Sequence, residues 1–178
     1  MSIITLIILG ISLSLDAFSL SIIYGTFIYS KKIKLLLSLT VGIFHFIMPL
    51  LGSYIGSFII SNFISDPDIL VAIIFTVLSI EMLLSIKDLD QTTKEFKNIL
   101  EALFFAFSVS IDSFTVGIAL GSGEENVVTA GIIFAFLSGL FTFCGLNIGT
   151  KLSLKFGKLA NVIGSILLLI LAIAHFFE

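Results

Sequence analysis

The chain has 178 residues, of which 58% are hydrophobic and 12% are charged, and its net charge at pH 7 is −3. Soluble globular domains are about 45 to 50% apolar and about 25% charged, so this composition excludes a soluble enzyme, a nucleic-acid-binding protein and a disordered chain. The single cysteine, Cys144, excludes an internal disulfide. The apolar content approaches what six bilayer crossings of about 20 residues each would require.

Six apolar stretches, each long enough to cross a bilayer as a helix, follow one another along the chain. They cover approximately residues 3–29, 35–60, 69–86, 99–121, 127–149 and 159–177. Helices are favoured over strands because the apolar runs are continuous, and because a helix in lipid satisfies its own backbone hydrogen bonds. The sequence therefore predicts an all-α polytopic membrane protein with six transmembrane helices, in which residues 1–178 form a single membrane domain.

The charged residues divide the loops into two classes. Lysines occur only in the first, third and fifth loops, as Lys31, Lys32, Lys34, Lys87, Lys94, Lys97, Lys151, Lys155 and Lys158. The second and fourth loops carry only the acidic residues Asp66, Asp68, Glu124 and Glu125. The positive-inside rule therefore predicts that the lysine-bearing loops, including the charged linker 87–98, are cytoplasmic and that both termini lie outside.

An internal repeat relates the first and fourth stretches. Residues 9–25 align with residues 105–121 at an offset of 96, and the identical pairs are Ser12/Ser108, Ser14/Ser110, Asp16/Asp112, Phe18/Phe114, Ile22/Ile118 and Gly25/Gly121. The second and fifth stretches share a GxxxG element, at 52–56 and 145–149, which we expect to form close helix contacts. The sequence predicts two three-helix repeats, approximately 1–86 and 99–178. They are inverted in the membrane, because each half has an odd number of crossings, as in many secondary transporters.

The repeated aspartates, Asp16 and Asp112, lie near the middle of their apolar stretches. An acidic side chain at the bilayer centre costs about 2.5 to 3.5 kcal/mol, and no basic residue near the centre of any stretch offsets this cost. Each aspartate shares a helical face with hydroxyl side chains about one turn away, which are Ser12, Ser19, Ser108 and Thr115. Paired carboxylates among oxygen donors favour Mg²⁺, Ca²⁺ or Mn²⁺, while protonation, internal hydrogen bonds or water are the other ways to stabilise them. We therefore predict a cation or proton site.

Three more polar side chains are candidates for the same pathway. His45 lies four residues before Pro49, whose missing N–H frees the carbonyl of His45. It is either a third metal ligand, which would favour Mn²⁺, or a hydrogen-bond partner of a neighbouring helix. Glu81 either lines an exit path or extends to the membrane interface, and Asn147 either coordinates the ion near the cytoplasmic side or forms a hydrogen bond.

Three short motifs stand out, which are SLDAF at residues 14–18, its repeat SIDSF at 110–114 and PLLG at 49–52. With these motifs the chain resembles, over essentially its whole length, the MntP family of bacterial manganese efflux pumps. The resemblance implies that the protein is a transporter rather than an enzyme, and that it exports Mn²⁺ from the cytoplasm across the bacterial cell membrane. Asp16 and Asp112 are then the functional aspartates, and Gly25 matches a glycine of the family. Mn²⁺ is the transported substrate, no tightly bound cofactor is expected, and protons are a candidate counter-ion. Some relatives carry a basic residue in the third helix where this chain has Glu81, so no role is transferred to that position.

Other functions stay open at the level of sequence. The same carboxylates fit a transporter of another cation or of a proton-coupled solute, which competition assays would distinguish. A non-transporting sporulation or assembly membrane protein would show no ion flux and no response to aspartate replacement. The chain has no Walker motif, so alternating access of a secondary transporter is the expected mechanism. Nothing in the sequence predicts an oligomeric state.

Overall fold

The computed structural model describes residues 2–25, 30–63, 67–85, 99–121, 126–149 and 154–177. The elements in these ranges are helices: α1 (Ile3–Gly25), α2 (Lys31–Phe63), α3 (Pro67–Ser85), α4 (Ile99–Val109), α5 (Ile111–Leu120), α6 (Val127–Ile148) and α7 (Leu154–Phe176). The predicted all-α fold is confirmed for this part of the chain. The fourth apolar stretch, predicted as one helix over 99–121, is instead divided at Ser110 into α4 and α5.

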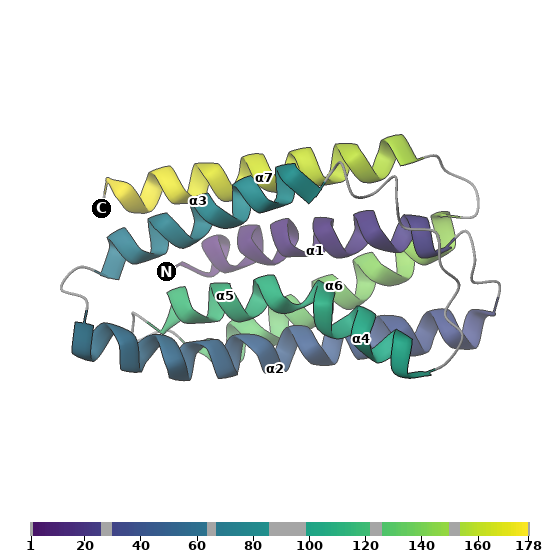
Figure 1. Cartoon of the computed structure of the whole chain (residues 1–178), viewed down its shortest axis with the longest axis horizontal. Coiled ribbons are helices and arrows are strands. Elements are labelled where there is room, and N and C mark those ends of the chain that lie inside the picture. The colour runs from purple at the N-terminus through teal and green to yellow at the C-terminus, as the bar shows by residue number, and fades with distance from the viewer. Residues whose placement is uncertain are drawn as a thin grey trace.

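The helices form an elongated bundle in which successive helices run in opposite directions, except that α4 and α5 run the same way (Figure 1). α1, α3 and α6 run away from the end where the N-terminus lies, and α2, α4, α5 and α7 run toward it, so both termini lie at the same end (Figure 1). The lysines carried by helices lie at the opposite end, in the first turns of α2 and α7, and are Lys31, Lys32, Lys34, Lys155 and Lys158. The other loop charges used to predict sidedness, Asp66, Lys87, Lys94, Lys97, Glu124, Glu125 and Lys151, lie outside the described residues.

Five segments are long and apolar enough to cross a membrane. They are Ile3–Gly25, Lys31–Asn62, Leu103–Leu120, Val127–Ile148 and Lys158–Phe176. The chain is therefore a multi-pass membrane protein. The crossing predicted at 69–86 falls on α3, which is not among these five and packs along α7.

The bundle is apolar on its outside and polar at several places inside. Large hydrophobic side chains cover its surface, and Phe104 and Phe136 are 63% and 69% exposed. A continuous apolar surface of this kind is unfavourable in water and matches lipid. Polar side chains are buried between the helices instead, and they include Ser12, Ser14, Ser19, His45, Ser110, Ser138, Thr142 and Asn161.

Glycines bring α2 and α5 into backbone contact. A Cβ atom added at Gly52 would collide with the carbonyl oxygen of Phe114, and one at Gly56 would collide with that of Ile118. Since only glycine leaves room for this approach, the first GxxxG element is a close helix contact, as predicted.

The same contact recurs between α6 and α1. A Cβ atom at Gly145 would lie 2.8 Å from the carbonyl oxygen of Phe18, and one at Gly149 would collide with that of Ile22. Phe18 and Ile22 are the residues that the 96-residue offset aligns with Phe114 and Ile118. The two GxxxG elements therefore contact equivalent positions of the repeated motif.

Candidate cation site

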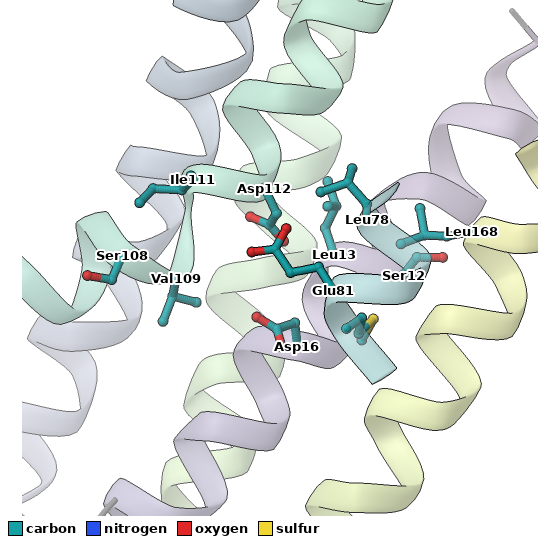
Figure 2. Close-up of a pocket in the computed structure, with 11 residues that line it drawn as sticks. Ser12, Leu13, Asp16, Leu78, Glu81, Ser108, Val109, Ile111, Asp112 and Leu168 are labelled. Atoms are coloured by element: carbon teal, nitrogen blue, oxygen red, sulfur yellow. The ribbon is translucent and has the colours of Figure 1, made fainter. Parts of the chain in front are cut away.

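Three carboxylates from three helices face one cavity (Figure 2). Asp16 comes from the middle of α1, Glu81 from α3 and Asp112 from the first turn of α5. The cavity has a volume of about 160 Å³, and the described residues that line it are Ser12, Leu13, Asp16, Leu78, Glu81, Met82, Ser108, Val109, Ile111, Asp112 and Leu168. At about 30 Å³ per water molecule, this is room for roughly five waters or for a partly hydrated cation.

The carboxylates of Asp16, Glu81 and Asp112 point into the space between their helices, with no basic side chain among the described lining residues (Figure 2). Like charges in a site of low dielectric repel one another, so the ionised site is unstable without a cation or protons. Within the described ranges, no group of three His, Cys, Asp or Glu side chains is close enough to hold a metal ion. Direct binding by all three carboxylates would therefore require them to approach, or waters to complete the coordination.

Asp112 is placed in the cavity by the break between α4 and α5. Ser110 has φ −107° and ψ 4°, and α5 begins at the next residue. Asp112 then lies in the first turn of α5, where the unsatisfied backbone N–H groups favour a carboxylate. Its Oδ1 accepts a hydrogen bond of 2.7 Å from the backbone N–H of Ser113. The aspartate is thus held by the start of its own helix.

Asp16 lies in an unbroken helix and is held by a different element. The side chain of Asn161 on α7 forms a hydrogen bond with Asp16. Asn161 is fully buried, and its Nδ2 lies 3.5 Å from the carbonyl oxygen of Met82 on α3. Sequence analysis missed Asn161, although an amide within the last apolar stretch was the signal that could have found it.

Only some of the predicted polar residues reach this cavity. Glu81, Ser12 and Ser108 line it together with the two aspartates. The hydroxyl of Ser12 donates to the carbonyl oxygen of Ile8 in its own helix, and that of Ser108 points away from Asp112 (Figure 2). These two serines therefore form part of the wall without presenting their hydroxyls to the carboxylates.

The other predicted site residues lie elsewhere among the described helices, outside the cavity lining. Ser19 is buried between helices, and Thr115 and Asn147 form hydrogen bonds with carbonyl groups of their own helices. Gly25 packs against Leu146, because a Cβ atom there would lie 2.5 Å from its carbonyl oxygen. The apolar wall of the cavity, including Leu78, was not predicted, since nothing in the sequence separates such residues from lipid-facing ones.

His45 is not among the residues that line the cavity, and its role as a metal ligand stays a prediction. Its Nδ1 lies 3.0 Å from the carbonyl oxygen of Val41 and 2.9 Å from Oγ of Ser110. The contact with Ser110 is a hydrogen bond with a neighbouring helix, as in the alternative interpretation. The reason is the rotation of α2 about its axis, which turns this fully buried imidazole toward the break between α4 and α5.

Comparison with known proteins decides the family. The model of the family described as "Putative manganese efflux pump" (MntP) matches residues 28–176. The chain belongs to the MntP family. A Desulforamulus reducens protein named "Putative manganese efflux pump MntP" is 34% identical over 180 residues, covering 99% of this chain and 100% of the relative. Proteins of the same name from Bacillus cereus (strain B4264) and Bacillus thuringiensis (strain Al Hakam) are each 33% identical over 166 residues, covering 93% of this chain and 91% of the relative. No solved structure matches. The resemblance to MntP inferred from the repeated motif is confirmed.

Proposed function

We propose that the protein exports Mn²⁺ from the bacterial cytoplasm and binds the ion between Asp16, Glu81 and Asp112. The names of its relatives indicate manganese and efflux. The observation that carries the site is the convergence of three carboxylates on one cavity whose described lining holds no basic residue. Carboxylate and water oxygens are the donors preferred by hard divalent cations, a group that includes Mn²⁺.

Charge balance explains how binding could be coupled to movement. A divalent cation offsets two of the three carboxylate charges, and protons can neutralise the same carboxylates after the cation has left, so protons that replace the cation are the natural counter-ion. Without a cation the carboxylates repel one another, and with a cation they attract a common centre. The ion therefore favours a conformation in which α1, α3 and α5 lie closer together, because it binds that conformation more tightly.

Alternating access by two inverted repeats is supported by the equivalent packing of the two halves. α1 and α5 carry the repeated motif and run in opposite directions (Figure 1). Each one packs on the GxxxG element of a helix from the other half, α1 on α6 and α5 on α2. Six crossings, with α3 as the third, would let the halves exchange conformations so that the site opens to one side at a time.

The test is manganese content and growth under manganese challenge in a bacterium that lacks its own exporters. We expect the intact protein to lower cellular manganese. We expect Asp16→Asn and Asp112→Asn to abolish the effect at matched membrane levels, because each removes a charged ligand from the cavity. Glu81→Gln should weaken it, and Thr115→Ala serves as the matched polar control because its hydroxyl binds only its own helix among the contacts described.

Two outcomes would contradict the proposal. Unchanged manganese with the intact protein would favour another cation, a proton-coupled solute or a non-transporting sporulation or assembly role. Full activity of both aspartate variants would remove the cation site. If the aspartate variants do lose efflux, competition by Mg²⁺, Ca²⁺ and Fe²⁺ would establish which cation the site prefers. An all-oxygen donor set leaves this preference broad.

A further inference from the structure

His45 contacts the break between α4 and α5. The break consists of Ser110 alone, whose backbone N–H bonds Phe107 O at 3.1 Å rather than continuing the helical pattern. The Ser110 hydroxyl donates to the carbonyl oxygen of Ala106 at 2.8 Å. On its other side, this hydroxyl lies 2.9 Å from Nδ1 of His45, which reaches it from α2.

One protonation arrangement satisfies all of these contacts. The carbonyl oxygen of Val41 can only accept, so Nδ1 must carry a proton to bond with it at 3.0 Å. The same N–H then faces the free lone pair of Ser110 Oγ, whose own hydrogen is directed to Ala106. His45 is fully buried, and its Nε2 has no hydrogen-bond partner among the described residues. The imidazole is therefore a neutral donor that acts through Nδ1.

The other half of the molecule makes the equivalent contact with a serine in place of the histidine. Ser14, the repeat equivalent of Ser110, lies 3.2 Å from Oγ of Ser138 on α6. α1 continues through Ser14 without a break. The GxxxG elements align at an offset of 93 residues, which makes Ser138 the equivalent of His45. The half with the histidine has the broken helix, and the half with the serine has the unbroken one.

The position of the break matters because Asp112 follows it by two residues. α5 is docked on α2 below the break through backbone contacts, since a Cβ atom at Gly117 would collide with the carbonyl oxygen of Pro49. His45 lies on α2 one turn before Pro49, and it contacts Ser110, the residue just before α5 begins. The direction of the first turn of α5 therefore depends on the contact between His45 and Ser110. The position of the Asp112 carboxylate depends on it as well.

We propose that His45 is a positioning residue for the cation site: its Nδ1–H holds Ser110 at the break and so fixes the turn that carries Asp112. This inference rests on the proposed function, because the site that it orients is the one assigned to Mn²⁺. It differs from direct ligation, in which the imidazole would coordinate the ion itself. The two roles predict different Mn²⁺ affinities when His45 is replaced by asparagine and by glutamine.

The experiment measures the Kd for Mn²⁺ of the purified full chain, together with hydrogen exchange of the backbone at residues 108–114. An asparagine amide can occupy the place of Nδ1, whereas a glutamine amide extends to the place of Nε2. We expect His45→Asn to bind Mn²⁺ like the wild type, and His45→Gln and His45→Leu to bind more weakly. Loss of one net hydrogen bond corresponds to roughly a two- to tenfold rise in Kd. The weakened variants should also exchange faster at 108–114, with no change in α1.

Ser110→Ala removes the acceptor and should weaken binding to a similar extent. Combined with His45→Leu it should add little, because both changes break the same contact. Ser138→Ala is the matched control: it removes the equivalent contact on the unbroken helix and should leave both Mn²⁺ binding and exchange unchanged.

Contrary results distinguish a failure of the positioning role of His45 from a failure of the cation site. Equal weakening by His45→Asn and His45→Gln, with unchanged exchange at 108–114, would overturn positioning in favour of direct ligation. Normal binding by all His45 variants, while Asp112→Asn weakens binding, would overturn the positioning role alone. If Asp112→Asn binds Mn²⁺ like the wild type, the proposed cation site itself fails and the positioning role fails with it.

Discussion

Asp16 and Asp112 occupy equivalent positions of the repeated motif, yet different atoms hold their carboxylates. Asp112 is bound by the backbone of Ser113 at the start of α5, whereas Asp16 is bound by Asn161 from another helix. The amide of Asn161 also faces the backbone of α3 at Met82. Asn161 therefore connects one aspartate to the helix that carries Glu81, and it makes the two carboxylates unequal.

We predict that Asn161→Leu weakens manganese efflux while the protein still reaches the membrane. The change removes the neutral donor of Asp16, and losing a hydrogen bond to a charged group costs about 1.5 to 3 kcal/mol, or roughly 10- to 100-fold in affinity. The measurement is efflux against manganese concentration, in which the half-saturating concentration should rise. Asn147→Leu is the control, because it also replaces a helix asparagine, but one that does not line the cavity. Equal effects of both substitutions would contradict a role beside Asp16.

At the scale of elements, glycines determine how closely the helices approach. On α2, Gly56 faces the backbone of Ile118, which cannot rotate away as a side chain could. On α6, a Cβ atom at Gly139 would lie 3.3 Å from the carbonyl oxygen of Ser38, which leaves almost enough room. The same substitution should therefore have different consequences at these two positions.

We predict that Gly56→Ala destabilises the protein by about 1 to 3 kcal/mol, because it forces α2 and α5 apart. Gly139→Ala should be near neutral, since a small steric cost is offset by the higher helix propensity of alanine, worth about 1 kcal/mol. Thermal unfolding of the purified proteins in one detergent would measure both. An equal loss of stability in the two variants would argue against a specific contact between α2 and α5.

At the scale of the whole molecule, the lysines among the described residues lie at one end of the bundle and both termini lie at the other (Figure 1). If the lysine end faces the cytoplasm, Ser30 lies inside the cell and Ser61, near the end of α2, lies outside. Both residues are exposed, which makes them suitable positions for labelling.

We predict that, in a Cys144→Ser background, an impermeant thiol reagent labels Ser61→Cys in intact cells. It should label Ser30→Cys only after the membrane is opened, because the bilayer separates the two ends of α2. The reverse pattern would invert the orientation, and with it the direction assigned to export.

Much of this architecture could be predicted from the sequence, because burial in lipid imposes strong local rules. Continuous apolar stretches predicted the helices, the 96-residue offset identified Asp16 and Asp112 as a pair, and the GxxxG elements predicted close contacts. Each of these signals lies within one segment or in the comparison of two segments. None of them requires knowing how a helix is rotated about its axis.

Composition and local pattern alone determined that the chain is helical, spans a membrane and carries two repeated acidic residues in its apolar stretches. Only the tertiary structure decided that Glu81 faces the aspartates, that Asn161 binds Asp16 and that His45 contacts Ser110. The motifs around Ser14 and Ser110 are nearly the same, yet only the second interrupts its helix. The physical reason is that helix rotation and packing place distant residues together, and a side chain from another helix supplies the hydrogen bond that a local sequence cannot contain.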